Sequence, residues 1–397
     1  MTDPWEQFRR AADRADVAGY FERAPDGGDR AGRAAWFTEA DRILGLAPRS
    51  DFTEFSRAAD GFVRRGRRRA VFGYLGFDAY GLVEPALRHF PSGSPFPLGE
   101  FAFATGVRFS TVPPRSPLRV GPLAPPRGGR DALPRSRYVE SVRRLRRDIR
   151  DGEAYQVVLA NRRAWTRPAD LLARAGRLRA SERFAFFFYL KFHDRELVGA
   201  SPESVVEIDG RRAVVNPIAG TLPAGRAGHG RRPLRADPKE LAEHRMLVDL
   251  ARNDLGRVAV PGTVRLLQRE ERVRYARLEH LVSRVGAELR RDVGPWEVLA
   301  AAFPAGTVSG APKIRATELL RREEGTWRGP YGGAVGLVGP GRRADWALTI
   351  RSAFGAGQKL YTAAGAGIVY RSKPEQEFTE TLAKLAHVEG TLLGGRG

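Results

Sequence analysis

The chain has 397 residues, 42% of them hydrophobic and 28% charged, a composition that excludes disordered and fibrous proteins. It contains no cysteine, which excludes disulfides, thiolate metal sites and cysteine nucleophiles. The formal net charge of +21 comes mostly from arginines that are spread along the whole chain, without interleaved aromatic residues. We therefore interpret the charge as a general bias toward arginine, and keep a nucleic-acid-binding protein only as the alternative from another functional class.

Membrane and secretion signals are missing from the sequence. No segment approaches the roughly 18 to 20 apolar residues that a membrane helix needs. Residues 1–6 have neither the basic start nor the apolar core of a secretory signal. We therefore expect a cytoplasmic protein that binds no membrane.

The first part of the chain divides into two regions. The hydrophobic pattern of residues 1–111 predicts an N-terminal region of short helices with one buried strand at 71–77. Residues 112–134 are rich in proline, glycine and arginine and show no period, which is typical of a linker or surface loop. A basic amphipathic helix at 135–151 then begins a third region, residues 135–390.

The third region alternates blocks of strands with blocks of helices. Its predicted strands are 155–159, 184–192, 197–200, 204–208, 212–215, 333–338, 346–354 and 360–363. Its further predicted helices are 238–250, 275–289, 295–301, 311–322 and 375–387. Short connections between strands favour antiparallel pairing, so the fold class predicted is α+β.

Two pairs of glutamates lie on predicted helices. Glu240 and Glu243 are three residues apart, as are Glu377 and Glu380, so each pair projects from one helix face. Two such pairs facing each other would form an oxygen-rich site for Mg²⁺. Taken alone, each pair is better explained as a solvated helix face, because spacing cannot show that the pairs meet.

Two glycine-rich segments fit no familiar phosphate loop. Gly365-Ala366-Gly367 lacks the third glycine of a dinucleotide-binding motif, and residues 306–313 lack the ending of a P-loop. Such loops can still offer N–H groups to an anion. For either segment alone, a tight turn is the favoured interpretation.

Eight short strings occur in order over about residues 136–388. They are GASPES (199–204), PIAGT (217–221), ELAEHRMLVDLARNDLGRV (240–258), HLVS (280–283), FPAGTVSGAPK (303–313), YGGAVG (331–336), AGAGIV (364–369) and ETLAK (380–384). Together they resemble the chorismate-utilising enzymes, most closely component I of anthranilate synthase. The resemblance implies two large antiparallel sheets packed as a sandwich with flanking helices.

The resemblance also implies how the substrate is held. Mg²⁺ would bind the ring carboxylate of chorismate, with Glu243 and Glu380 as ligands and Glu240 and Glu377 behind them. The residues implied to contact the rest of the substrate are Tyr331, Arg351, Lys384, Gly365, Ala366, Gly367, Ala219, Gly220 and Thr221.

Four positions carry the chemistry that the resemblance implies. Glu203 matches a general acid that protonates the departing C4 hydroxyl, and His280 matches a histidine linked to pyruvate elimination. Gln156 occupies the position of a lysine base in water-adding relatives and could instead orient ammonia. Ala219 occupies the position of a lysine nucleophile in relatives that make 4-amino-4-deoxychorismate. Direct attack of ammonia on C2 is therefore implied.

The implied reaction converts chorismate to anthranilate by amination at C2 and elimination of pyruvate. The chain cannot form the cysteine thioester that glutamine hydrolysis needs, so a separate glutamine amidotransferase subunit is the implied source of ammonia. A 2-amino-2-deoxyisochorismate synthase and an aminodeoxychorismate synthase component I, in folate or specialised metabolism, remain alternatives.

The family's tryptophan-binding strings are not kept in this chain. Their nearest counterparts are residues 19–23 and 183–187, and neither retains the pattern. The sequence therefore predicts that tryptophan does not inhibit the protein.

Overall fold

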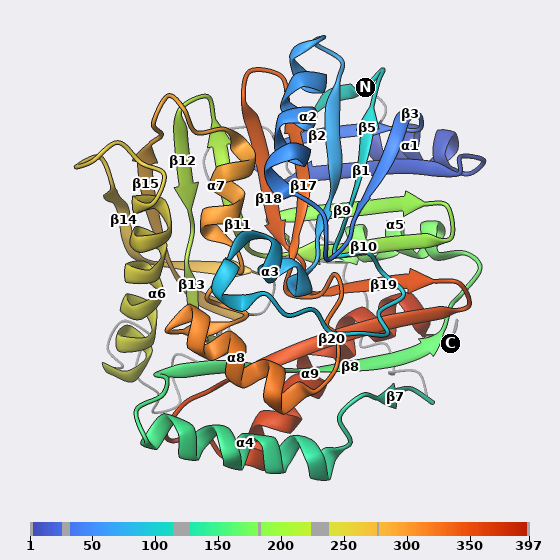
Figure 1. The fold of residues 1–397 in the computed structure, drawn as a ribbon. Coiled ribbons are helices and arrows are strands. Elements are labelled where there is room, and N and C mark those ends of the chain that lie inside the picture. Colours follow the sequence, from blue (N-terminus) through green and yellow to red (C-terminus); the bar gives the residue numbers. More distant parts are fainter. Residues whose placement is uncertain are drawn as a thin grey trace.

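Two large antiparallel β-sheets form the framework of the chain in the computed structural model (Figure 1). The structure describes residues 3–25, 32–113, 128–181, 184–223, 238–275 and 278–394. Ten strands of this part belong to each sheet, and helices flank them. The predicted α+β class and the two-sheet sandwich are confirmed.

The first sheet runs in the order β16-β8-β20-β19-β10-β9-β1-β2-β6, with β7 paired to β8. Its strands are β1 (Val17–Arg23), β2 (Gly32–Phe37), β6 (Arg108–Val112), β7 (Arg130–Asp131), β8 (Gln156–Thr166), β9 (Phe186–Phe192), β10 (Arg195–Ser201), β16 (Gly310–Ala311), β19 (Ser352–Ala356) and β20 (Lys359–Ile368).

The second sheet runs in the order β13-β15-β12-β11-β18-β17-β4-β5-β3, with β14 paired to β15. Its strands are β3 (Ala40–Leu46), β4 (Ala70–Leu75), β5 (Gly99–Ala104), β11 (Ser204–Asp209), β12 (Arg212–Val215), β13 (Ile218–Pro223), β14 (Arg265–Tyr275), β15 (Leu278–Glu288), β17 (Ala334–Gly339) and β18 (Arg343–Leu348).

Nine α-helices are found in the described residues. They are α1 (Pro4–Ala12), α2 (Phe52–Arg64), α3 (Tyr80–Val83), α4 (Arg135–Arg150), α5 (Leu171–Ser181), α6 (Pro238–Gly256), α7 (Pro295–Ala302), α8 (Lys313–Glu324) and α9 (Pro374–Leu393). Helices α4 and α9 lie along β8 and β20 in the lower part of Figure 1, and α6 packs against β13 and β15. No helix in the described ranges is both long and apolar enough to span a bilayer.

The N-terminal region contains more strands than its sequence predicts. Only β4 was expected, yet β1, β2, β3, β5 and β6 accompany it. Strands such as β4 and β5 are buried on both faces, so they lack the polar alternation that marks a strand in a sequence. Strands of residues 1–111 and of residues 135–390 share both sheets.

Two predicted elements of the third region are wrong. Residues 275–289 were expected to be a helix, but β15 pairs there with β12, β13 and β14. Its β-branched residues Val282 and Val285 are buried, so tertiary pairing outweighs the weak helical pattern. Residues 346–354 were expected to be one strand, but a turn separates β18 from β19.

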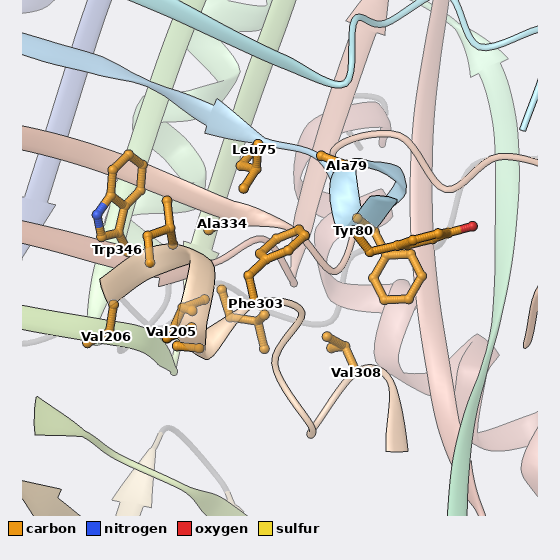
Figure 2. Packing of buried hydrophobic residues seen from close by; sticks show 14 of the residues in the cluster. Leu75, Ala79, Tyr80, Val205, Val206, Phe303, Val308, Ala334 and Trp346 are labelled. Carbon is orange, nitrogen blue, oxygen red and sulfur yellow. The ribbon is translucent and has the colours of Figure 1, made fainter. Parts of the chain in front are cut away.

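A hydrophobic cluster supports the segments around the candidate site (Figure 2). Figure 2 shows Val205, Phe303 and Val308 packed with Leu75 and Tyr80, and all five side chains are buried. Val205 follows the predicted acid Glu203 by two residues, and Val308 follows Thr307. Close packing leaves such side chains few alternative positions, so the cluster fixes the backbone that carries the site.

Candidate active site

Glu203 is a buried carboxyl group at the junction of β10 and β11. Its side chain is 8% exposed, and Thr307 Oγ1 donates a hydrogen bond to its Oε1 at 2.7 Å. Burial raises the pKa of Glu203 to about 8, and the Thr307 hydroxyl opposes part of that rise. The group is therefore protonated at neutral pH and can donate a proton, as a general acid must.

A cavity of about 360 Å³, including the space at its mouth, lies against Glu203 and Thr307. Apolar side chains of α6 line it, among them Leu247 and Ala251. Asp254 also lines it and binds Lys313 Nζ at 2.7 Å. The acid thus faces a partly apolar cavity, which favours its neutral form.

Tyr331, Gly365, Lys384 and Glu380 are brought together beside β20. Lys384 Nζ donates to the carbonyl of Gly365 at 2.8 Å and pairs with Glu380 at 2.7 Å. The Gly365 N–H bonds the hydroxyl of Tyr331, whose pKa is raised by burial to about 12. A Cβ at position 365 would lie 3.1 Å from Val158 Cγ1, so glycine allows this close approach. Backbone and cationic groups of this kind suit a carboxylate ligand.

Gln156 lies next to Gly367 on the same face of the first sheet. A Cβ at position 367 would lie 2.4 Å from Gln156 Nε2, so a larger residue would displace the amide. Gln156 Oε1 is buried and accepts no hydrogen bond from any described residue. Ala366 points the other way, into the cluster that contains Val157 and Leu159. Only the backbone of Ala366 can therefore take part in the site.

Arg351 lies in the turn between β18 and β19. Its φ of 48° is in the left-handed region, which non-glycine residues occupy only when the surroundings hold them there. Its carbonyl accepts from Ala200 N at 3.2 Å, and the adjacent Thr349 carbonyl accepts from Gly332 N at 2.8 Å. The turn therefore lies beside the segment that carries Tyr331.

His280 is buried on β15 and faces the register shift in β13. Ala219 pairs with Leu281 and Leu222 with Glu279, which puts the backbone of Gly220 and Thr221 opposite His280. The roles expected of the side chains at positions 219–221 lie outside the described residues.

The two glutamate pairs lie on α6 and α9. The pKa of Tyr138 on α4 is raised mainly by burial, and also by the negative charges of Glu377 and, more weakly, Glu380. The α9 pair therefore lies near the Tyr138 hydroxyl. Carboxylate oxygens are the ligands that Mg²⁺ prefers, and the donor chemistry fits. Within the described residues, no three acidic or histidine side chains gather closely enough to hold a metal, and the side chain of Glu240 lies outside them.

Three features of the site were missed in the sequence. Thr307 and Lys313 lie in the string at residues 303–313, which carries the family resemblance but indicates no role for either side chain. Their contacts with Glu203 and Asp254 join segments far apart in the chain. Tyr138 carries no sequence signal beyond its place on an amphipathic helix. Such contacts could be found only from the fold.

Comparison with known proteins then decides the family. Residues 27–389 match the family described as chorismate binding enzyme. The chain belongs to this family. The motif-based resemblance of the sequence is confirmed.

Named relatives of this chorismate binding enzyme are anthranilate synthase subunits. Component 1 of anthranilate synthase from Methanothermobacter thermautotrophicus is 41% identical over 268 residues, which are 66% of this chain and 58% of the relative. Component 1 from Thermus thermophilus is 44% identical over 250 residues, 62% of this chain and 54% of the relative. The chain thus spans little more than half the length of the curated relatives it matches.

Solved structures of chorismate binding enzymes share the fold. Anthranilate synthase component I from Streptococcus pneumoniae TIGR4 is 25% identical and has a TM-score of 0.78, covering 92% of this chain and 93% of that one. A putative 2,3-dihydroxybenzoate-specific isochorismate synthase from Bacillus anthracis has a TM-score of 0.75 at 22% identity, covering 98% and 99%. At that identity, the second likeness concerns the fold alone.

Proposed function

We propose that this chorismate binding enzyme aminates chorismate at C2 with ammonia and then eliminates pyruvate to give anthranilate. The relatives named anthranilate synthase component 1 support this reaction. The observation that carries it is Gln156, a buried amide oxygen without a hydrogen-bond donor among the described residues. Ammonia can donate an N–H to this oxygen and keep its lone pair for attack, whereas glutamine cannot deprotonate water.

Glu203 is the proposed acid for the amination step. As the nitrogen bonds to C2, the ring double bonds shift and the C4–O bond breaks. The proton of Glu203 joins the departing hydroxyl, which leaves as water. The ammonium group formed at C2 then releases one proton, which restores the acid, so the net step takes up ammonia and releases water. A carboxyl group whose pKa is raised to about 8 keeps that proton at neutral pH.

His280 is the proposed base for the second step. Removal of the proton at C2 forms the aromatic double bond while the C3–O bond breaks. The enolpyruvyl group leaves as the enolate of pyruvate, whose methylene carbon takes up a proton to give pyruvate. The buried position of His280 on β15 keeps the imidazole away from bulk water. Neutral imidazole is a suitable base near neutral pH.

The substrate carboxylates need cationic or N–H partners. We assign the enolpyruvyl carboxylate to Tyr331, Arg351 and the backbone at Gly365–Gly367, with Lys384 beside them. Arginine suits this role because its planar fork can bind a carboxylate with two hydrogen bonds. The contacts of Lys384 and Tyr331 with Gly365 support this assignment.

We assign Mg²⁺ binding to Glu243 and Glu380, with Glu240 and Glu377 behind them. When bound, the ion would supply positive charge for the ring carboxylate and offset repulsion among the glutamates. Glu380 is half-exposed and pairs with Lys384 at 2.7 Å, so its carboxylate remains accessible to an ion.

Ammonia is proposed to come from a separate glutamine amidotransferase subunit in the cytoplasm, since the chain has no cysteine for glutamine hydrolysis. The test supplies the purified chain with chorismate, MgCl₂ and ammonium chloride at alkaline pH, and identifies the product by fluorescence and mass. We expect anthranilate with ammonium and no product with glutamine. Accumulation of 2-amino-2-deoxyisochorismate would instead identify an amination-only enzyme.

A variant tests the role of Gln156 directly. Gln156→Leu keeps the side-chain volume and removes the acceptor. We expect the KM for ammonia to rise about 10-fold while the KM for chorismate changes little, since a lost hydrogen bond is worth about 1 to 1.5 kcal/mol. An unchanged KM for ammonia would reject this role.

A further inference from the structure

Arg328 is a buried arginine that joins three segments around the candidate site. Its side chain is 4% exposed. The guanidinium donates to the carbonyl of Val158 on β8 and to the carbonyl of Val308, each at 2.7 Å. Glu324 on α8 holds the same guanidinium through both carboxylate oxygens, and Glu324 also accepts from Ala160 N at 2.9 Å.

The two carbonyls belong to two neighbouring segments of the site. Val308 follows Thr307, the hydrogen-bond donor to the acid Glu203. Val158 pairs with Gly367 on β20, beside Gln156. Backbone pairing already joins these segments, since Val158 N donates to the Ser309 carbonyl at 2.9 Å and β16 pairs with β8. The guanidinium adds a second connection at the same junction, between the segment that holds the acid and the strand that carries Gln156.

The backbone of Arg328 is fixed as well. Asp78 accepts from Arg328 N at 3.0 Å and from Gly329 N at 2.7 Å, and Phe77 N donates back to the Gly329 carbonyl at 2.9 Å. Two residues later the chain reaches Tyr331, which meets Gly365. The N-terminal region thus holds the loop that presents Tyr331.

We propose that Arg328 is a positioning residue that aligns the acid side of the site with the substrate-binding strands, and that Asp78 holds the loop from which it acts. This rests on the proposed function, because both sides must then act on one substrate molecule. The role requires arginine: a planar fork can donate to two carbonyls and a carboxylate at once, whereas lysine has a single nitrogen. Misplacement of reacting groups by about 1 Å can cost about 100-fold in rate.

The test compares Arg328→Lys with Arg179→Lys. Arg179 is an equally buried arginine, 3% exposed and held by Glu22 and Asp3 outside the site. Both variants keep the charge and lose the fork, so both should lose similar stability. We expect Arg328→Lys to lower kcat/KM for chorismate about 10- to 100-fold, through both kcat and KM, and Arg179→Lys to change it less than 2-fold.

A second readout separates positioning from folding. If Val308 moves, Thr307 loses its hold on Glu203, and the alkaline limb of the pH profile shifts upward in Arg328→Lys but not in Arg179→Lys. Equal kinetics and equal pH limbs in the two folded variants would overturn the proposal. If Arg328→Lys does not fold, Asp78→Asn is tested in its place. We then expect the same fall in kcat/KM and the same upward shift of the alkaline limb, each smaller than for Arg328→Lys. Failure of the unmodified chain to consume chorismate would instead overturn the proposed function, and this role with it.

Discussion

The acid side and the proposed metal side of the site are built in different ways. Glu203 is buried and already hydrogen-bonded by Thr307, within well-packed strands. Glu380 is 51% exposed and pairs with Lys384, and Glu243 belongs to a different helix. A single carboxyl can be held neutral by burial, but several carboxylates repel one another until a cation joins them. Under the proposed function, the acid side is complete in the protein alone, whereas the metal side needs a bound cation.

The largest expected effect concerns the completed side. Glu203→Gln keeps the shape and removes the proton donor, so we expect kcat to fall about 10²- to 10⁴-fold. Steady-state rates with ammonium and saturating chorismate measure the loss. A chorismate KM within about 3-fold of the original would show that the site itself persists. Near-normal turnover would show that Glu203 is not the acid.

The metal side should respond to both mutation and chelation. We expect Glu380→Gln to lower kcat/KM at millimolar Mg²⁺ by about 100-fold, and EDTA to abolish the activity of the unmodified chain until Mg²⁺ is restored. Glu375→Gln is the matched control, because Glu375 lies on the same helix and only pairs with Arg135 at 2.8 Å at the surface. Equal rates in the two variants would reject the metal role.

A third expectation concerns pH. Glu203 must be protonated to act, so at a fixed concentration of free ammonia kcat/KM should fall as pH rises through about 8. Thr307→Val removes a hydrogen bond that lowers the pKa of Glu203, so the falling limb should move up by about 0.5 to 1 pH unit. A limb that stays in place would mean that Thr307 does not act on the acid.

The buried acid should also reduce stability at alkaline pH. Between pH 4.5 and about 8 the unfolded carboxyl loses its proton while the folded one keeps it, so the free energy of unfolding falls as pH rises. Glu203→Gln removes this dependence and should raise Tm by roughly 3 to 8 °C at pH 8, and by much less at pH 5. Thermal unfolding at the two pH values measures the difference. Equal gains at both would contradict it.

The smallest expected effect is that of tryptophan, which should leave the rate of the enzyme unchanged. Arg23 lies in the N-terminal string where the family binds tryptophan, and it pairs with Glu207 at 2.8 Å and Asp345 at 3.2 Å. Both carboxylates that Arg23 contacts are therefore already paired with a cation. We expect millimolar L-tryptophan to leave the initial rate unchanged at fixed chorismate. Half-inhibition at micromolar tryptophan would reveal a working effector site.

The sequence predicted elements best where one face is polar or a turn is clear. Strand β12 falls at the predicted residues 212–215, and α4 ends one residue before its predicted end, whereas α9 continues to Leu393, past its predicted end at 387. Strand β5 was missed because it is buried on both faces and, apart from Glu100, has no polar side chain to mark a solvent face. Within the candidate site, strings of residues predicted Glu203 and Gly365, but side-chain spacing could not show that Thr307 or Lys384 would contact them. Those contacts depend on the packing of both sheets.

The strand order has a consequence for how the chain is made. Strand β4 pairs with β17, and β8 pairs with β20, so each sheet joins early segments to the last third of the chain. During synthesis on a ribosome, β4 and β8 emerge long before their partners and leave backbone edges unpaired. Such edges favour aggregation, and distant pairings slow folding. The nascent chain therefore cannot complete either sheet until its C-terminal strands leave the ribosome.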